Sequence, residues 1–408
     1  MKNKLLVAIA LVFTILCLVS CEYISDIANV TFDLNGAGNT WTVGVKSGEK
    51  ISEPAEPSRD GYVFEGWYLE EEKFDFSTPI TKNIKLIAKW APKSPIVTFD
   101  SNGGTEVASI QLDYGTKLTI PSNPTREGDY EFLGWTLNGE NFNNEVAITN
   151  NITLKALWGT DLSTSGEYVV LNATQNIKYK TLLSAVNESK ENDTIILLSD
   201  YVTPNLGNWI EYNFADGCIF DLNGYKLTNN VNAPGTTEAG VDSQSVYQGK
   251  NITVQNGKID GDGSYVLFIG NETKDTSFTL KNITTIGGIN CYVAKVTLKE
   301  GNHFDASTKE YYAVYGDEAT QIVIEDGKYI GGTNGITVMQ FNYEGNTIEI
   351  TGGEYTGKIN TFTNSNSNGN ALVKVTGGKF SDDPSSYVPE GYTTIHNVNG
   401  TYTVTKVN

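Results

Sequence analysis

Apolar residues alternate with polar ones in the C-terminal half of the chain, in three nearly identical phrases. The phrases begin at Ile322 (IVIEDGKYI), Ile348 (IEITGGEYT) and Val373 (VKVTGGKFS), so their starts lie 26 and 25 residues apart. Each has two apolar residues two apart and a glycine three further on, which predicts a strand and then a sharp turn. A strand, a turn and a strand every ~25 residues are typical of one coil of a parallel β-helix.

Four upstream segments carry a looser form of the same pattern. They are CIFDLNGYKL from Cys218, ITVQNGKID from Ile252, FTLKN from Phe278 and VTLKEGNHF from Val296. The Phe278 segment lacks the glycine, so the pattern leaves its register open. In the Val296 segment, His303 stands where the other coils have an aromatic residue. The stretch Asn230–Gly249 is too polar for a core strand and is predicted to form a protruding loop.

Elements of a different kind are predicted at the two ends of this region. After a polar connector, Gly159–Gly166, the positions of Leu182, Leu183 and Val186 predict an amphipathic helix over 179–190. An apolar strand over 193–198 follows it. A helix leading into a strand resembles the N-terminal cap of pectate-lyase-like β-helices, whose coils are right-handed like other parallel crossovers. Such a cap covers an edge that would otherwise be open.

The C-terminal segment, Tyr387–Val407, is rich in threonine and alternates around Asn399-Gly400. Asn-Gly is the strongest two-residue hairpin signal. The segment is therefore predicted to be a hairpin that closes the far end of the β-helix.

A second duplication precedes the β-helix, over Val30–Trp90 and Val97–Trp158. Its openings are VTFDLNG and VTFDSNGG, its centres PSRDGYVFEGW and PTREGDYEFLGW, and its ends ITKNIKLIAKW and ITNNITLKALW. Short alternating segments broken by Asn-Gly and Pro predict small, mostly β units. Both units resemble the Listeria–Bacteroides repeat (internalin B-repeat), a β-grasp-like module of bacterial surface proteins.

Aromatic and basic residues recur at matching positions of the two repeats. The recurrent tryptophans are Trp67, Trp90, Trp135 and Trp158. They are predicted to fill the two small cores, and an exposed sugar-stacking platform is the alternative. Arg59 and Arg126, the only arginines, are expected to lie flat on an aromatic ring or to pair with a carboxylate. Two prolines in Ala91–Ile96 predict a short, stiff linker, so that the repeats form a stalk.

The first twenty residues form a targeting segment rather than part of the fold. Lys2 and Lys4 precede the apolar run Leu5–Val19, which is short for a membrane-spanning helix. The run ends in Leu-Val-Ser before Cys21, which resembles a bacterial lipobox, and this resemblance implies lipid attachment at Cys21. An ordinary signal peptide with an incidental cysteine and an uncleaved anchor are the alternatives. Acyl chains on Cys21 would hold the chain at a membrane.

Charge and cysteine content limit the partners and crosslinks of the 408-residue chain. It has 48 acidic against 29 basic residues and a formal charge of −19. Nucleic acids require clustered Lys and Arg, so no nucleic-acid partner is predicted. Cys218 and Cys291 lie about three coils apart in the predicted register, roughly 14 Å. A disulfide requires about 7 Å between Cα atoms, so both are predicted to be small buried residues.

The pectate-lyase resemblance raises the alternative of a polysaccharide-cleaving enzyme. Lyases of that class use carboxylates that hold Ca²⁺ and a basic residue, often Arg, but no Arg follows Arg126. The hydrolases use grouped Asp residues near a Gly-His-Gly motif, which neither His303 nor His396 provides. A lysine base remains open. The prediction is therefore a non-enzymatic protein without catalytic residues.

Two acidic segments are candidates for a metal site. Asp260-Gly261-Asp262-Gly263 could begin an EF-hand-like Ca²⁺ loop, but its twelfth position is Asn271 rather than an acidic residue. A turn between strands is the better interpretation. Asp382-Asp383 precede a proline and have the pattern of a solvated turn. No metal or other cofactor is predicted.

The sequence predicts a mostly β chain: two small β-grasp-like repeats in tandem, then a capped right-handed parallel β-helix. The predicted parts are a signal peptide (1–20), a tether (21–29), the repeats (30–90 and 97–158) and the β-helix (167–408). The predicted function is adhesion, or binding of a host or microbial glycan or protein, by a protein lipid-anchored at the cell surface. A polysaccharide lyase or glycoside hydrolase, and a purely structural envelope component, are the alternatives.

Overall fold

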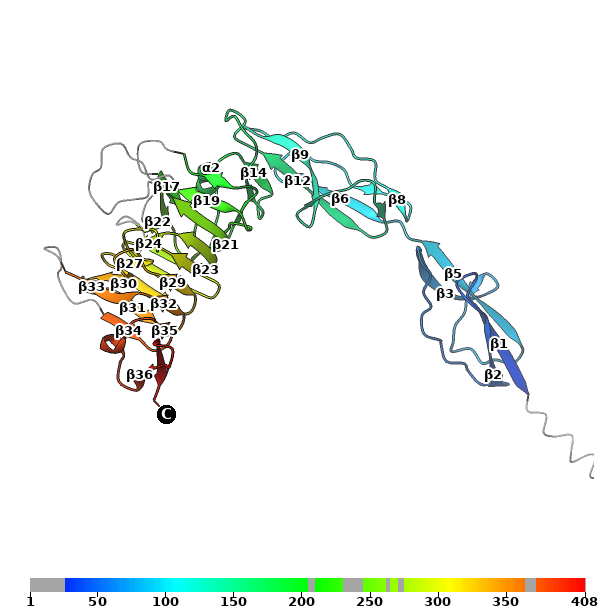
Figure 1. Cartoon of the computed structure of the whole chain (residues 1–408). Coiled ribbons are helices and arrows are strands. Elements are labelled where there is room, and N and C mark those ends of the chain that lie inside the picture. Colours follow the sequence, from blue (N-terminus) through cyan, green and yellow to red (C-terminus); the bar gives the residue numbers. More distant parts are fainter. Residues whose placement is uncertain are drawn as a thin grey trace, which may run out of the picture. The chain divides into compact units, whose positions relative to one another are not determined.

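The computed structural model describes residues 26–204, 210–229, 245–261, 265–270, 275–363 and 372–407 (Figure 1). These residues are mostly β-strand, which confirms the predicted class. They form two compact units. One contains the chain up to Thr98, Ala108–Pro121 and Asn143–Thr153, and the other contains Phe99–Val107, Ser122–Phe142 and the chain from Leu154 onward.

The first repeat is a five-stranded sheet with the strand order β2-β1-β5-β3-β4. Its strands are β1 (Ile27–Asp33), β2 (Trp41–Lys46), β3 (Tyr62–Leu69), β4 (Glu72–Lys73) and β5 (Ile84–Pro92). Strands β1 and β5 are parallel, and the other neighbours are antiparallel. Alternate residues face one side, where Val30, Phe32 and Leu86 surround Trp67 in the core.

The second repeat has the same kinds of element in shorter pieces. Its strands are β6 (Ile96–Asp100), β7 (Ile110–Gln111), β8 (Thr116–Lys117), β9 (Glu131–Leu137), β10 (Glu140–Asn141), β11 (Ala147–Ile148) and β12 (Ile152–Gly159). Strands β9 and β12 pair antiparallel with one register shift, as β3 and β5 do in the first repeat.

The rest of the chain, which we call the coil region, winds through three ladders of parallel strands (Figure 1). The first ladder contains β15 (Thr194–Leu197), β18 (Ile219–Asp221), β21 (Ile252–Gly261), β23 (Thr276–Ile286), β25 (Ala294–Leu298), β28 (Gln321–Ile324), β31 (Thr347–Ile350) and β34 (Leu372–Val375). The second contains β16 (Tyr201–Val202), β19 (Lys226–Asn229), the second halves of β21 and β23, β26 (His303–Asp305), β29 (Lys328–Ile330), β32 (Glu354–Thr356) and β35 (Lys379–Phe380). The third contains β17 (Ile210–Asn213), β20 (Ser245–Gln248), β22 (Tyr265–Ile269), β24 (Gly288–Cys291), β27 (Val314–Gly316), β30 (Ile336–Phe341) and β33 (Lys358–Phe362).

The predicted apolar pairs form two buried columns through the first ladder. One column is Ile252, Phe278, Val296, Ile322, Ile348 and Val373, and the other is Val254, Leu280, Leu298, Ile324, Ile350 and Val375. The second ladder adds a stack of Tyr329, Tyr355 and Phe380, whose ring centroids are 5.2 and 4.7 Å apart. Each large side chain buried in this way stabilises the fold by about 1.5–3 kcal/mol.

The Phe278 coil keeps the common register although it lacks the glycine. Phe278 pairs with Ile252 on one side and Val296 on the other. In these coils asparagines make the turn, with φ of 61° at Asn256 and 53° at Asn282. Asparagine tolerates this left-handed conformation better than most residues. The Asn282 side-chain amide also donates to Asn256 Oδ1 at 3.2 Å, which links the two coils.

Two sequence predictions about individual coils were wrong. Phe304, not His303, lies in register with Tyr329, because the turn before β26 is one residue longer than in the next coil. Part of the predicted loop Asn230–Gly249 is the buried strand β20. Its polar residues, Ser245 and Gln248, are fully buried, so the hydrophobic pattern could not find it. Residues 230–244 lie outside the described residues.

The start of the coil region continues directly from the second repeat. Strand β12 pairs with β14 (Ile177–Tyr179), which pairs with β13 (Val170–Asn172) and so leads to β15. The predicted connector therefore begins inside a strand, at Gly159. The predicted helix is present but short, α2 (Leu182–Asn187), because Tyr179 belongs to β14. The Thr181 hydroxyl caps this helix by accepting from the Ser184 N–H at 3.1 Å.

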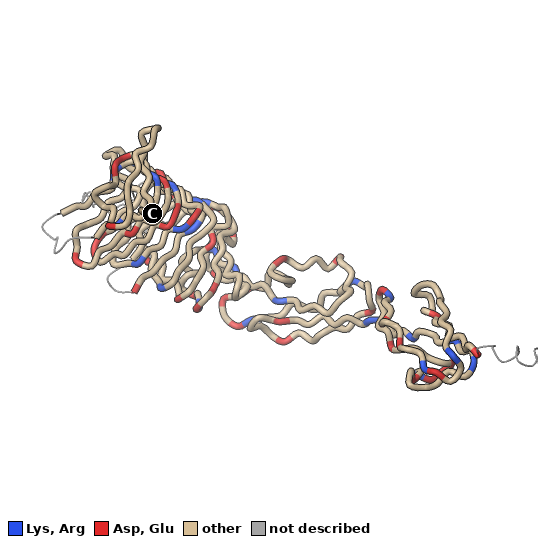
Figure 2. Tube along the Cα trace, turned by 90° about the horizontal axis from the view of Figure 1, so that it is seen from below, with Lys and Arg blue, Asp and Glu red and all other residues tan. Residues whose placement is uncertain are grey.

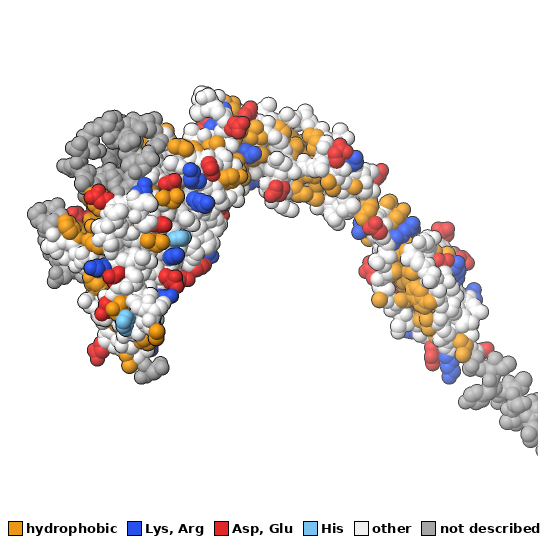
Figure 3. Space-filling view, viewed as in Figure 1, with side chains coloured by type: hydrophobic (Ala, Val, Ile, Leu, Met, Phe, Trp, Pro, Cys, Tyr) orange, Lys and Arg blue, Asp and Glu red, His pale blue; other side chains and the backbone are white. Residues whose placement is uncertain are grey.

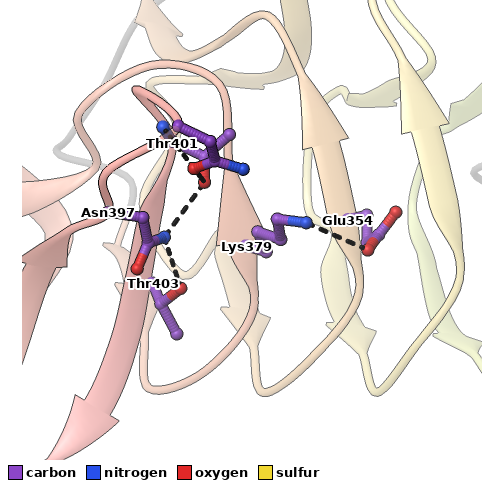
Figure 4. A network of polar contacts seen from close by, with 6 residues as sticks. Glu354, Lys379, Asn397, Thr401 and Thr403 are labelled. Atoms are coloured by element: carbon purple, nitrogen blue, oxygen red, sulfur yellow. Dashed lines mark hydrogen bonds and ion pairs between the residues drawn. The ribbon is translucent and has the colours of Figure 1, made fainter.

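The predicted hairpin follows β35 and the 3-10 helix η1 (Ser385–Tyr387). It consists of β36 (Tyr392–His396) and β37 (Tyr402–Lys406), and β37 also pairs with β35. Its loop spans five residues rather than two. The Asn397 amide donates to the Thr401 and Thr403 hydroxyls at 3.0 and 2.9 Å, and these bonds hold the longer loop (Figure 4).

Candidate functional site

The acidic segments predicted to be turns do not gather into a metal centre. Asp260 Oδ1 accepts from the Gly261 N–H at 2.8 Å, whereas Asp262 and Gly263 lie outside the described residues. Asp383 accepts from the Ser385 N–H at 3.0 Å, which helps to form η1. Within the described ranges, no group of three His, Cys, Asp or Glu side chains could hold a metal ion.

The two histidines lie apart and in different settings. His303 is half-buried on the outer side of the second ladder, in register with Lys328. Its Nε2 is buried without a hydrogen-bond partner in the described structure. His396 stacks on Tyr402, with a centroid distance of 4.7 Å. Both histidines therefore occupy strand positions rather than a shared site.

The recurrent residues of the repeats have the predicted structural roles. Trp67, Trp135 and Trp158 are no more than 5% exposed, and Trp90 is half-buried. Each arginine lies over an aromatic ring: the Arg59 guanidinium is 3.9 Å from the Tyr62 ring centroid, and that of Arg126 is 3.8 Å from the Tyr130 ring centroid. These findings favour the core interpretation over a sugar-stacking platform.

In the described part of the chain, Cys218 and Cys291 are free and buried. Cys218 precedes β18 beside the first ladder, and its thiol donates to the Lys190 carbonyl at 3.3 Å. Cys291 belongs to β24 in the third ladder, between two and three coils further along the chain than Cys218. Burial raises the pKa of the Cys291 thiol, which makes it unreactive. The predicted lipid site, Cys21, lies outside the described residues.

Charged residues on the coil region neutralise one another between neighbouring coils. The ion pairs among its described residues are Lys250–Asp275 at 3.5 Å, Lys281–Glu300 at 3.1 Å, Lys374–Glu349 at 3.1 Å and Lys379–Glu354 at 3.7 Å. The charge-coloured trace and the space-filling view show lysines and acids intermixed (Figures 2 and 3). These exposed pairs are typical of a solvated surface.

An open depression on the first repeat is one candidate site. Its volume is about 480 Å³, and Glu53, Glu56 and Glu65 line it together with Phe64 and Lys73. It lies over Gly66, whose lack of a Cβ leaves room for the stem of Lys73. The depression is acidic and broad, and none of its polar groups is buried without a partner.

The stronger candidate is a group of four tyrosines beside the third ladder, which we call the tyrosine cluster. Its members are Tyr265, Tyr311, Tyr312 and Tyr315. The Tyr265 ring lies nearly parallel to those of Tyr311 and Tyr315, with centroid distances of 5.8 and 5.7 Å. Tyr312 is tilted against the same two rings, at 6.0 and 5.6 Å. Tyr265 is buried, and the other three rings are half-buried.

The third ladder assembles this cluster from three successive coils. Tyr265 lies on β22, Tyr315 lies on β27, and Gly288 on β24 lies between them. A Cβ on Gly288 would be 3.2 Å from the Tyr265 ring and would overlap the Tyr312 carbonyl. The glycine therefore allows Tyr265 to reach the rings of the coil beyond.

A polar pair lies next to the rings. Asn290 stands in register with Phe268 and Tyr315. Its chain neighbours Ile289 and Cys291 are fully buried in the core, so Asn290 points to the outer side of the ladder. It is nevertheless only 3% exposed, and its Oδ1 has no hydrogen-bond partner in the described structure.

The second member of the pair is Asp317, which follows β27. Burial raises the pKa of Asp317 to about 6, and the neighbouring charge of Glu318 acts in the same direction. Hydrogen bonds from the Glu318 N–H at 3.0 Å and from the Asn290 and Tyr315 side chains oppose the rise. The cluster thus combines aromatic faces with a carboxylate and an amide oxygen, which is a set suited to holding a ligand.

Comparison with known proteins gives a family for the repeats. Residues 29–89 and 96–157 each match the Listeria-Bacteroides repeat domain. The chain is 33% identical over 166 residues to a protein of Evansella cellulosilytica named "Putative membrane protein", and 33% identical over 117 residues to Internalin H of Listeria monocytogenes. These segments cover 40% and 28% of this chain.

The same segments span only 23% of the Evansella protein and 20% of Internalin H. No solved structure matches the chain. No helix in the described part of the chain has the length and apolar character needed to cross a bilayer. The comparisons thus confirm two Listeria-Bacteroides repeats in a chain similar to proteins named for the membrane and to an internalin.

Proposed function

We propose that this chain is a bacterial cell-surface protein that binds a ligand through its coil region without catalysing a reaction. The observation that carries the proposal is the tyrosine cluster, in which three half-buried rings lie near a buried amide oxygen, Asn290 Oδ1, that has no hydrogen-bond partner in the described structure. Tyrosines present a large contact area at little cost in side-chain entropy, which makes them frequent anchors of interfaces. The two repeats and the similarity to Internalin H support a surface location.

We also propose an architecture for the coil region and the repeats. The three ladders close into a capped right-handed parallel β-helix of the pectate-lyase-like kind, with α2 and the β36–β37 hairpin at its ends. Its boundaries are 167–408, and the repeats at 30–90 and 97–158 display it as a stalk. The buried columns of the first ladder and the pairing of β37 with β35 support this arrangement.

Attachment through a lipid at Cys21 completes the proposal. Its test is labelling of growing cells with a palmitate analogue. The expected result is label in the wild type and in the matched variant Cys17→Ala, and none in Cys21→Ala. Equal labelling of both variants would remove the lipid anchor from the proposal.

The binding test presents the full chain to an array of glycans and to a panel of extracellular-matrix proteins. We expect at least one ligand, whose affinity falls by about tenfold or more in Tyr312→Ala, as for a central aromatic anchor. Tyr225→Ala is the matched control, since Tyr225 is an exposed tyrosine elsewhere on the coil region. If no ligand binds, or if both variants bind alike, adhesion through the cluster is wrong.

The enzyme alternative makes a different prediction for the same samples. Incubation with a panel of polyuronates and neutral polysaccharides should release no unsaturated product and no new reducing ends. Release that is lost in Asp317→Asn would replace binding with catalysis as the function of the site.

A further inference from the structure

One buried atom at the tyrosine cluster, Asn290 Oδ1, is a hydrogen-bond acceptor without a partner in the described structure. The Asp317 carboxylate beside it can accept further bonds. An unpaired buried acceptor destabilises the fold, and a donor from a ligand would offset that cost. The site is therefore suited to a ligand that donates hydrogen bonds through N–H or O–H groups.

The charge at the site is negative and lacks a counter-ion. Asp317 is largely buried, yet no Lys, Arg or His of the described chain forms an ion pair with it. The charge of a neighbouring acid, Glu318, also raises the pKa of Asp317. A buried carboxylate without a counter-ion is unfavourable, and a bound cation would relieve that cost.

The tyrosine rings also favour a positively charged ligand. The faces of tyrosine rings are electronegative and attract cations within about 6 Å of the ring centroid. Tyr315 is hydrogen-bonded to Asp317, and the Tyr312 ring lies 5.6 Å from that of Tyr315, so both rings are close to a group bound at Asp317. Hydrogen bonding, charge and ring electrostatics all favour a cationic donor over a neutral sugar.

The burial of Asn290 limits the shape of the ligand group that could donate a hydrogen bond to it. Asn290 is only 3% exposed and its Oδ1 is shielded from solvent, so only a slim group could approach that oxygen, and the neighbouring rings would have to shift to admit it. A lysine side chain has a slim apolar stem that packs along aromatic surface and a terminal ammonium with three donors. The formal charge of −19 also favours a basic partner.

Building on the proposed function, we infer that the tyrosine cluster binds the ammonium group of a lysine side chain on a partner protein. The ammonium donates to Asp317 and to Asn290 Oδ1, and the stem of the lysine lies against Tyr312 and Tyr315. The ligand of the coil region is thus a lysine-bearing protein surface.

The first test measures binding of hexalysine to the full chain by calorimetry at physiological salt. Asp317→Asn should weaken binding by about tenfold, because a charge-assisted hydrogen bond is lost. Glu325→Gln removes the same charge from an exposed site on the coil region and should change affinity less than twofold. Equal effects of the two variants would mean unspecific attraction to an acidic protein and would overturn the inference.

A second set of probes tests whether binding requires the ammonium group and whether a lysine side chain or a sugar ring must carry it. Hexalysine acetylated on every side chain should not bind, and a chitosan hexamer, whose ammonium groups sit directly on sugar rings, should bind at least tenfold more weakly than hexalysine. Tyr312→Phe keeps the ring and should retain binding, whereas Tyr312→Ala should lose about tenfold. Stronger binding of chitosan would overturn the lysine assignment in favour of an amino sugar.

The pH dependence is a further readout. The titratable groups that face Asp317 are Glu318, Tyr265, Tyr315 and Cys291. Of these, the tyrosines and the cysteine stay neutral below pH 8 because burial raises their pKa values. Affinity for hexalysine should therefore fall by about tenfold from pH 7.5 to pH 5 as Asp317 takes up a proton. An unchanged affinity would overturn the role of Asp317.

The outcomes also separate this inference from the proposed function. If the binding screen finds a ligand that needs Tyr312 but tolerates acetylation of its lysines and Asp317→Asn, the lysine inference fails and surface binding stands. If no ligand of any kind depends on Tyr312, the proposed function fails as well. Melting curves of each variant should match the wild type within a few degrees, since the substituted side chains are partly exposed.

Discussion

The two repeats show one module in two different surroundings. In both, the last tryptophan donates from its indole N–H to the carbonyl of the opening motif, Trp90 to Leu34 at 2.9 Å and Trp158 to Ser101 at 3.1 Å. Yet Trp158 is 1% exposed, and Trp90 is half-buried. The motif thus fixes the internal contacts, and the neighbouring chain decides how deeply the same residue is buried.

The difference arises where the second repeat meets the coil region. The Asn102 amide donates to the Ala156 carbonyl at 3.2 Å and also to the Gln175 carbonyl at 2.6 Å. Its counterpart Asn35 has only the first of these bonds, to Ala88 at 3.3 Å. A repeat residue that caps a turn in one copy therefore joins two parts of the chain in the other.

Deletion of the second repeat should have the largest effect on the stability of the coil region. A chain that starts at Thr160 loses the pairing of β12 with β14 and the bonds from Asn102 and Lys155 to the coil region. At about 0.5–1.5 kcal/mol for each bond, plus an uncovered strand edge, the coil region should lose about 5 kcal/mol of unfolding free energy. Denaturant unfolding followed by circular dichroism measures the loss.

The matched control deletes the first repeat, through Pro92. The bonds just described belong to the second repeat, so the unfolding midpoint of the coil region should stay within error of the full chain. Equal destabilisation by both deletions would show that the two copies support the coil region alike, and the contrast between them would be wrong.

Substitution of the last tryptophan of each repeat should give the next largest difference in unfolding free energy between the two repeats. Trp158→Ala should cost about 3–5 kcal/mol because a large, fully buried side chain leaves a cavity. Trp90→Ala should cost about 1–3 kcal/mol, since part of that ring is already in water. Urea denaturation of each variant measures both values. A loss for Trp90→Ala as large as that for Trp158→Ala would contradict the difference in burial.

Sequence reasoning found those tryptophans because period-two patterns and a duplicated motif mark buried positions directly. It also found the first and second ladders, where apolar pairs such as Ile348 and Ile350 recur. It missed the third ladder, since strands such as β20 and β24 bury Ser245, Gln248 and Asn290 and have no apolar alternation.

The tyrosine cluster could not be predicted for the same reason. Tyr265 and Tyr315 are 50 residues apart in the chain and meet only through the register of the third ladder. The one available signal was the density of tyrosine around Tyr311-Tyr312, which has no periodicity. Only the pairing of the strands shows that these rings lie together.

A smaller effect is expected at the paired asparagines. Asn35 and Asn102 both have a φ of 50°, which glycine adopts without strain. Asn102→Gly should therefore cost about 1–2 kcal/mol more than Asn35→Gly, because only Asn102 bonds to Gln175. Thermal unfolding of the two variants gives the difference. Equal losses would mean that the Gln175 bond contributes nothing to stability.

The smallest effect concerns the one ion pair of the first repeat that the second lacks. Lys85 Nζ lies 2.7 Å from Asp33, whereas the corresponding position of the second repeat is Thr153. Lys85→Thr should cost about 0.2–1 kcal/mol, since the pair is largely exposed, and less at high salt.

The hydrogen bond from Lys85 is the main cause of the lowered pKa of Asp33. A lowered carboxyl pKa stabilises the fold above the unfolded value of 3.8, so the difference between variant and wild type should vanish as the pH falls below about 4. A difference that persists at pH 2 would assign the loss to packing of the lysine stem rather than to the ion pair, and the two repeats would then differ in their cores as well as in their surroundings.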